Sequence, residues 1–218
     1  MGDLLLLRHG ETEWTLSRQH TGHTDLPLTA NGEHQARAVA PLLANRTIAL
    51  ALTSPLQRAK RTAELAGLDD AQIEPNLREW DYGAYEGLTT AQIRTMRPAW
   101  NLWTDGVAIG PEDRPGESPQ QVGARADRVL AHVRPLLGDR VDGDVVLVAH
   151  GHFLRVLAAR RLGLPPAAGA IFQLGTGTLS TLGTEHGRPV ISSWNEMPAQ
   201  VPAEGAYPGR LSGLAYVG

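Results

Sequence analysis

The sequence has no cysteine among its 218 residues, which excludes disulfide frameworks and metal sites with cysteine ligands. It also lacks a long apolar run. Residues 4–7 are four leucines that Arg8 ends at once, whereas a membrane-spanning helix needs about 20 apolar residues. The N-terminus carries no secretory signature. We therefore expect a cytoplasmic protein that does not contact a membrane.

A basic excess is missing as well. The formal net charge is -3, whereas nucleic-acid binders usually carry a basic excess, so we expect no nucleic-acid partner. An anionic substrate remains compatible with this balance, because a small cluster of Arg and His makes one pocket positive. The composition, 42% hydrophobic and 20% charged, predicts one folded domain over residues 1–195. A Gly/Pro/Ala-rich tail over residues 196–218 is predicted to carry little structure.

Strand and helix patterns alternate along the chain. Apolar runs predict strands at residues 3–7, 48–52, 145–149, 171–174, 178–182 and 189–193. Helical spacing and cap signals predict helices near residues 29–42, 55–67, 89–95, 99–103 and 119–137, and one after His150. Pro55 is placed in the first turn of the second helix, a position that suits proline. This alternation predicts an α/β fold, a mostly parallel sheet with helices on both faces.

Polar residues follow three of the predicted strands. Arg8 and His9 follow the first, residues 54–58 follow the second, and His150 follows the strand at 145–149. In open α/β sheets the site lies beyond the carboxyl ends of the strands. We therefore expect Arg8, His9, Arg58 and His150 to meet there.

This set of side chains suits phosphate chemistry. Arginine binds two phosphate oxygens through a planar fork, and a neutral imidazole is nucleophilic near neutral pH. We expect His9 to attack phosphorus and form phosphohistidine, which water then hydrolyses. Because Arg8, Arg58 and His150 carry the countercharge, no metal or other cofactor is required. Glu79, partly shielded by Trp80, is the candidate general acid and is expected to keep its proton at mildly acid pH.

Four segments together resemble the motifs of the histidine phosphatase (phosphoglycerate mutase-like) superfamily, in that family's order. They are Leu7-Arg8-His9-Gly10-Glu11-Thr12, residues 54–63 with Arg58, Leu77-Arg78-Glu79 with the following glycines, and Val148-Ala149-His150-Gly151. The resemblance covers roughly residues 4–182. It implies catalytic roles for Arg8, His9, Arg58, Glu79 and His150. It also implies a single three-layer α/β/α domain whose mostly parallel six-stranded sheet has one antiparallel strand.

Within the superfamily, residues 79–87 and 150–155 look most like a branch of sedoheptulose bisphosphatase-like enzymes and actinobacterial acid phosphatases. In that family the loop matched by Thr21 and Gly22 contacts the non-phosphate part of the substrate. Gly151 and His152 are further substrate-binding candidates, although His152 could simply open its helix. Thr15 stands where many members have Asn, which puts one phosphate contact in doubt.

The resemblance implies a metal-independent phosphomonoesterase acting on a small phosphorylated metabolite, with a sugar phosphate as one candidate. Two alternatives stay open. A phosphoglycerate mutase is disfavoured, because the paired-Arg insertion of the cofactor-dependent mutases has no counterpart between residues 88 and 117. A non-catalytic phosphate-binding module is disfavoured by the complete set of catalytic residues. Predicted edge strands also permit a homodimer.

Three further features have a second interpretation. His150 with His152, and His20 with His23, have the spacing of metal-ligand pairs, but no suitably spaced carboxylate accompanies either pair. His20 and His23 are expected at the pocket rim. The aromatic residues between 80 and 103 are expected mainly in the core, and some of them could cover the pocket.

Overall fold

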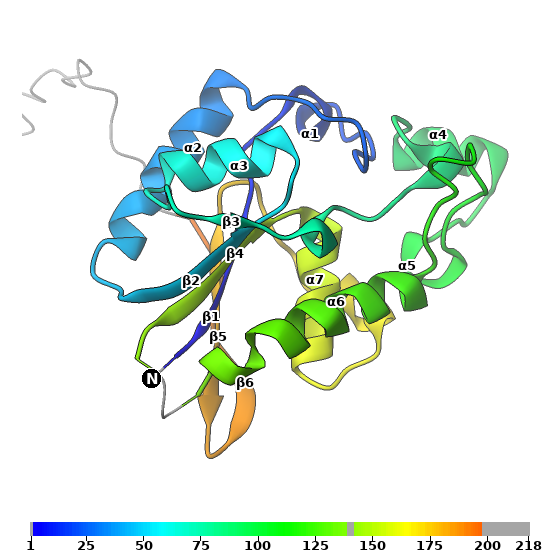
Figure 1. Cartoon of the computed structure of the whole chain (residues 1–218). Helices are drawn as coiled ribbons and strands as arrows, with labels where there is room; N and C mark the ends of the chain where they lie inside the picture. The colour runs from blue at the N-terminus through cyan, green and yellow to red at the C-terminus, as the bar shows by residue number, and fades with distance from the viewer. Residues whose placement is uncertain (1, 139–141, 198–218) are drawn as a thin grey trace, which may run out of the picture.

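The computed structural model describes residues 2–138 and 142–197 (Figure 1). Its strands are β1 (Leu4–Arg8), β2 (Ile48–Thr53), β3 (Gln72–Ile73), β4 (Asp144–Ala149), β5 (Leu179–Glu185) and β6 (Arg188–Glu196). Its α-helices are α1 (Glu13–Leu16), α2 (Ala30–Leu43), α3 (Gln57–Leu65), α4 (Thr90–Met96), α5 (Leu102–Asp105), α6 (Pro119–Val133) and α7 (Gly151–Arg161). From residue 198 onward the expected Gly/Pro/Ala-rich tail lies outside the described residues.

The six strands form one sheet in the order β3-β2-β4-β1-β5-β6. Strands β1, β2, β3 and β4 pair in parallel, β5 runs antiparallel to β1, and β6 runs antiparallel to β5. Thus β5 alone opposes the other five strands. The expectation of a mostly parallel six-stranded sheet with one antiparallel strand is confirmed.

Side chains of β1 alternate between the two faces of the sheet, as strand geometry requires. Leu4 and Leu6 pack in a cluster with residues of α6 and α7, whereas Leu5 and Leu7 pack with residues of α2 and α3. Figure 1 shows these two helix pairs on opposite faces. The chain therefore has three layers, α/β/α. No described helix is long and apolar enough to cross a membrane.

Local signals place most helices correctly. Thr29 caps α2 by accepting a hydrogen bond from the N–H of Gly32 (3.0 Å). The helix expected at residues 99–103 instead begins at Leu102, because Ala99 has a positive φ of 62° and the side chain of Asn101 caps the N–H of Trp103. The helices α4 and α5 lie at one end of the molecule, away from the centre of the sheet (Figure 1).

Two further expectations about secondary structure are wrong. Pro55 does not lie in the first turn of α3, which starts at Gln57. The N–H of Ser54 still pairs with the carbonyl of Val148 (3.0 Å), and proline keeps the residue before it extended.

Residues 171–174 form no strand. Ile171 ends a 3-10 helix (Pro166–Ile171) and residues 172–174 follow it. Side chains bind the main-chain carbonyls of two of these residues. Arg8 donates to Leu174 and Trp194 donates to Gln173. These residues are therefore held by side chains, where a strand would be held by a ladder partner.

Candidate active site

A pocket of about 470 Å³ lies where β1 and β4 end. Its lining includes seven of the ten residues that the sequence suggests as catalytic or substrate-binding: Arg8, His9, Thr15, Thr21, Glu79, Gly151 and His152. The remaining three, Gly22, Arg58 and His150, are buried beside these residues. The fold therefore brings all of them to one end of the sheet.

His9 directly follows β1, and its main-chain N–H donates to Ala149 at the end of β4 (3.0 Å). Its Nδ1 lies 2.7 Å from the carbonyl of Gly10, so Nδ1 carries the proton and Nε2 keeps a free lone pair. Burial, and then the charges of Arg58 and Arg8, lower the pKa of His9 well below 6.5. The imidazole is therefore neutral at about pH 7, the form that acts as a nucleophile.

His150 packs edge-on against His9, with ring centroids 5.0 Å apart. It is fully buried. Its Nδ1 accepts a hydrogen bond from Nε of Arg58 (3.2 Å), and its Nε2 donates to the hydroxyl of Ser54 (2.8 Å). Burial and Arg58 lower the pKa of His150 well below 6.5. Both ring nitrogens thus have protein partners here, and a direct contact of His150 with phosphate stays a prediction.

Arg58, on α3, is also fully buried. Besides binding His150, its guanidinium donates to the main-chain carbonyls of Thr21 (3.2 Å), Gly22 (3.0 Å) and Thr24 (2.8 Å). These bonds occupy most of its five N–H groups. In this structure Arg58 supplies positive charge beside His9 and fixes the turn at residues 21–24, whereas its contact with phosphate stays a prediction.

Glu86 binds the main-chain amides of the same turn. Its carboxylate accepts hydrogen bonds from the N–H groups of Gly22 and Thr24, each at 3.0 Å. Gly22 packs so closely that a Cβ there would lie 2.6 Å from the carbonyl oxygen of Trp80. Gly22 therefore serves the packing of the turn, and Thr21 is the member of this pair that lines the pocket.

Arg8 ends β1, and its Nη1 donates to the carbonyl of Leu174 (2.5 Å). Its buried Nε has no partner among the described residues. A Cβ on Gly151, the first residue of α7, would lie 3.1 Å from Cζ of Arg8. Gly151 thus leaves the space that the guanidinium occupies, and Arg8 keeps unpaired N–H groups for a ligand.

Glu79 lies at the N-terminus of α7. Its Oε1 accepts hydrogen bonds from the main-chain N–H groups of Trp80 (2.9 Å) and Phe153 (2.8 Å), and its Oε2 accepts one from His152 (3.0 Å). Glu79 is 6% exposed and Trp80 is fully buried, so the carboxyl group is shielded as expected. Because Oε2 has one protein partner, it retains a lone pair for a proton or a ligand.

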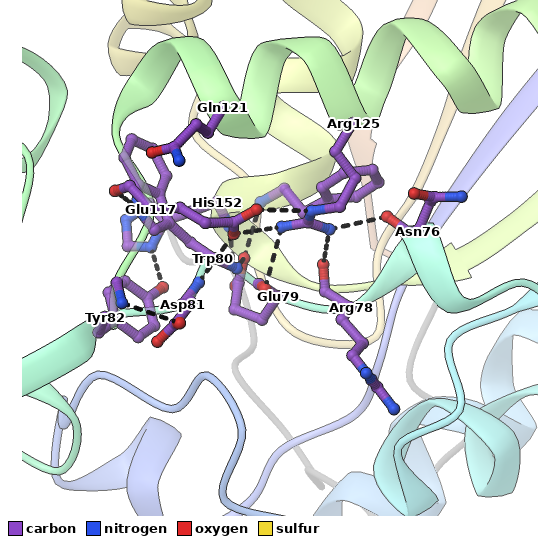
Figure 2. A network of polar contacts seen from close by, with 12 residues as sticks. Asn76, Arg78, Glu79, Trp80, Asp81, Tyr82, Glu117, Gln121, Arg125 and His152 are labelled. Carbon is purple, nitrogen blue, oxygen red and sulfur yellow. Dashed lines mark hydrogen bonds and ion pairs between the residues drawn. The ribbon is translucent and has the colours of Figure 1, made fainter. Parts of the chain in front are cut away.

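Arg125 on α6 holds the segment that carries Glu79 (Figure 2). Its guanidinium donates to the carbonyls of Asn76 (2.7 Å), Arg78 (2.5 Å) and Glu79 (3.1 Å). It also binds both carboxylate oxygens of Glu117, at 2.9 and 2.7 Å. Helix α6 is thereby connected to the acid-bearing segment although none of its residues lines the pocket.

Glu117 extends this network on its other side. Its Oε2 also accepts a hydrogen bond from the N–H of Asp81 (3.0 Å), and its carbonyl accepts one from Nε1 of Trp80 (2.8 Å). The residues on both sides of Glu79 are therefore fixed from α6 and the loop before it.

Thr15 lines the pocket, but its hydroxyl belongs to the cap of α1. The hydroxyl donates to the carbonyl of Thr12 (2.8 Å) and accepts from the N–H of Thr12 (2.9 Å). Both residues form a capping box. A phosphate contact through Thr15 would compete with these bonds.

His20, expected at the rim, is buried instead. Its Nδ1 donates to the carbonyl of Leu88 (2.8 Å), and its ring stacks on that of His152 with 6.1 Å between centroids. Nδ1 of His152 is hydrogen-bonded to the hydroxyl of Tyr82 (2.6 Å). Burial lowers the pKa of both histidines. Both rings are therefore polar and uncharged at about pH 7.

The aromatic residues between 80 and 103 form core, and some of them also face the pocket. Trp80, Tyr82, Tyr85 and Trp100 belong to the core, and Trp103 packs against it. Tyr82, Trp100 and Trp103 also line the pocket. The paired histidines serve other contacts, and no three potential metal-binding side chains gather in the part of the chain that the structure describes.

Sequence reasoning missed four residues that support the site: Ser54, Glu86, Glu117 and Arg125. Ser54 and Glu86 stand inside segments already singled out, so their position was a usable signal. Arg125 lies on a predicted amphipathic helix and carries no such signal.

Comparison with known proteins agrees with this geometry. Residues 4–197 match the model of the histidine phosphatase superfamily (branch 1). An acid phosphatase of Mycobacterium tuberculosis is 42% identical over 186 residues, which cover 84% of this chain and 87% of that protein. A sedoheptulose 1,7-bisphosphatase of Saccharomyces cerevisiae is 37% identical over 188 residues, covering 73% of this chain and 67% of that protein.

Among solved structures, a functionally characterised protein from Mycobacterium tuberculosis superposes with a TM-score of 0.82 at 39% identity. The match covers 91% of this chain and 99% of that one.

Proposed function

Because the chain belongs to the histidine phosphatase superfamily (branch 1), we propose that it is a phosphoric monoester hydrolase that transfers phosphate first to His9 and then to water. One observation carries this proposal. A neutral imidazole with a free Nε2, an arginine with unpaired N–H groups and a shielded carboxyl group line the same pocket. These are the groups that phosphoryl transfer through a covalent intermediate needs.

In the first step, Nε2 of His9 forms a bond to phosphorus as the bond to the ester oxygen breaks. Glu79 gives its proton to the departing oxygen, so the product leaves as a neutral alcohol. The hydrogen bond from Nδ1 to the carbonyl of Gly10 stabilises the positive charge that develops on the ring. Arg8 binds the phosphate oxygens.

In the second step, water attacks the phosphorus of phosphohistidine. Glu79, now ionised, takes a proton from that water, and the phosphorus–nitrogen bond breaks. Inorganic phosphate leaves, His9 returns to its neutral form and Glu79 is protonated again. The positive charges of Arg8 and Arg58 balance the negative charge of the phosphate in both steps. The mechanism therefore requires no metal ion.

The names of the relatives support a small phosphorylated metabolite as substrate, including a sugar phosphate. The net charge of -3 argues against nucleic acid as a partner. A cytoplasmic location, a homodimer and the division into a domain over residues 1–195 and a tail stay predictions.

Phosphate release tests the proposed function. Wild type and His9→Ala are assayed on a panel of phosphate esters with EDTA present, with His34→Ala, an exposed histidine on α2, as control. We expect release by wild type and His34→Ala but not by His9→Ala.

Other outcomes contradict the proposal in distinct ways. Loss of release on adding EDTA overturns metal independence, and release by His9→Ala overturns the covalent mechanism. If wild type releases no phosphate, interconversion of 3- and 2-phosphoglycerate identifies a mutase. Phosphate binding without any turnover identifies a binding module.

A further inference from the structure

The loop at residues 172–178 binds the backbone of Arg8 and His9. It connects the 3-10 helix (Pro166–Ile171) with β5. The N–H of Gly177 donates to the carbonyls of Arg8 (3.2 Å) and His9 (3.1 Å). The N–H of Arg8 in turn donates to the carbonyl of Thr178 (3.2 Å). The backbone that carries the nucleophile and its neighbouring arginine is therefore fixed on one side by this loop.

The same loop orients the side chain of Arg8. Nη1 of Arg8 donates to the carbonyl of Leu174, whereas its buried Nε has no partner among the described residues. Within the described part of the chain, the carbonyl of Leu174 is thus the acceptor that fixes the direction of the guanidinium. The nitrogens that stay unpaired are the ones that a phosphate can use.

The backbone of this loop has unusual conformational freedom. Gly175 and Gly177 lie on either side of Thr176, and glycine loses more conformational freedom on folding than any other residue. One bond within the loop, from the hydroxyl of Thr178 to the carbonyl of Gly175 (2.9 Å), supports it. The position of the loop therefore depends on contacts with other elements.

The C-terminal end of β6 supplies two such contacts. Oδ1 of Asn195 accepts a hydrogen bond from the N–H of Gly175 (2.6 Å). Nε1 of Trp194 donates to the carbonyl of Gln173. These contacts fall on the residues immediately before and after Leu174, so a change in either of them would shift the carbonyl that binds the guanidinium.

Strand β6 is distorted where these two side chains leave it. Residues 194 and 195 of β6 lie opposite residue 180 of β5, at a shift in the register of the two strands. Asn195 has a positive φ of 57°, and its N–H donates to the hydroxyl of the buried Ser180 (2.9 Å). A bulge of this kind redirects side chains, and asparagine is among the few residues besides glycine that adopt such a φ. Because backbone strain is often found at functional sites, the bulge favours a function for Asn195.

We propose that Asn195 is a positioning residue of the phosphate site, which acts through the loop at residues 172–178 on the guanidinium of Arg8. The last strand thereby contributes to phosphate binding without contacting the ligand, since the described residues that line the pocket include neither Trp194 nor Asn195. This inference rests on the proposed function, because Arg8 must bind the transferred phosphate.

Substitutions at Asn195 separate the side chain from the backbone. Asn195→Gly permits the positive φ and removes the acceptor, whereas Asn195→Asp keeps an acceptor oxygen and tolerates the same φ. We expect the Kd of inorganic phosphate, measured by calorimetry, to rise about tenfold in Asn195→Gly, the loss of one charge-assisted contact, and about twofold or less in Asn195→Asp. His186→Gly is the matched control, because exposed His186 also has a positive φ (50°) and lies in the turn between β5 and β6, at the end of β5 away from Arg8 (Figure 1). It should bind phosphate like the wild type.

A double-mutant cycle tests whether the effect passes through Arg8. Lysine at this position keeps the positive charge, but its rotatable ammonium does not need the carbonyl of Leu174 for its direction. In an Arg8→Lys background, Asn195→Gly should therefore raise the Kd of phosphate less than about twofold. An equal factor in both backgrounds overturns the proposal. A wild-type Kd in Asn195→Gly, or an equal loss in Asn195→Gly and Asn195→Asp, also overturns it.

Kinetics distinguish an action on Arg8 from a general loosening of the site. Because the contacts of Glu79 are unchanged, we expect Asn195→Gly to lower kcat/KM for glycerol 3-phosphate and for p-nitrophenyl phosphate by the same factor of about ten. A much larger fall for glycerol 3-phosphate shows that the acid is displaced as well and overturns the specific action on Arg8. If the wild type hydrolyses nothing, the proposed function fails, and the Kd of phosphate still decides whether Asn195 positions Arg8.

Discussion

The guanidinium group of Arg125 donates a hydrogen bond to the main-chain carbonyl of Glu79 across 3.1 Å. The donor lies on α6, outside the pocket, and the acceptor carries the candidate general acid. Arg125 therefore acts on the reaction only through the position of another residue, and a change there should alter catalysis without touching the substrate.

The variant Arg125→Lys tests whether Arg125 positions Glu79. Lysine keeps the charge but lacks the planar fork that reaches Glu117 and several carbonyls at once. We expect kcat on an alkyl phosphate to fall about 10- to 100-fold with a smaller change in KM, since small misplacement of a catalytic group has such effects. Arg128→Lys, on the exposed side of the same helix, is the control. Equal kinetics in both variants would show that Arg125 has a structural role alone.

Glu79→Gln tests the acid itself. The amide cannot donate a catalytic proton, so a substrate with a poor leaving group should suffer most. We expect kcat/KM for glycerol 3-phosphate to fall about 10²- to 10⁴-fold, and that for p-nitrophenyl phosphate much less. Steady-state phosphate release measures both. Equal slowing of the two substrates would count against the role of Glu79, and Glu64→Gln, on the exposed side of α3, should slow neither.

Gly151→Ala tests the space beside Arg8. The new Cβ would lie 3.1 Å from Cζ of Arg8 and displace the guanidinium by a few tenths of an ångström. We expect weaker inhibition by inorganic phosphate and a KM raised about tenfold, the loss of one charge-assisted contact. The Tm should hold, since alanine is a good helix residue. An unchanged inhibition constant for phosphate would refute this account of Gly151.

Stability should fall in mild acid. Burial lowers the pKa of four histidines: His9, His20, His150 and His152. Below about pH 6.5 the unfolded chain binds protons that the folded chain does not. The stabilisation of the folded chain by these neutral histidines is therefore complete above about pH 6.5. It decreases as the pH falls, by up to about 1.4 kcal/mol per pH unit for each histidine.

Thermal unfolding followed by circular dichroism measures this effect. We expect a Tm that changes little between about pH 8 and 7 and falls between about pH 6.5 and 5.5. His152→Gln should reduce the slope, and His34→Gln, on the exposed face of α2, should not. The same slope in His152→Gln and wild type would contradict the prediction.

The sequence alone predicts the part of the site that follows from strand order. Arg8 and His9 stand at the end of one buried strand and His150 directly after another, so the parallel sheet brings them together. The sequence also predicts the cap of α2, because the signal at Thr29 is local. The helix start at Leu102 was equally predictable from Asn101, a frequent N-cap residue.

What the sequence does not predict depends on contacts between distant residues. Residues 171–174 have a strand-like pattern, but side chains of Arg8 and Trp194 occupy their carbonyls. His20 resembles a loop residue, yet Tyr82 and Trp100 pack over it from another segment. The buried state of Arg58 has the same origin, since its partners lie in the turn at residues 21–24.

Two different parts of the chain form the pocket. Its phosphate end comes from the ends of β1 and β4, whereas the segment of residues 88–117, with α4 and α5, supplies Thr90, Arg94, Asn101 and Trp103 on the other side. The two stretches remain connected through Glu117, whose carboxylate binds Arg125 and the N–H of Asp81. An exchange of the second stretch that is meant to leave the chemistry at His9 in place must therefore keep Glu117.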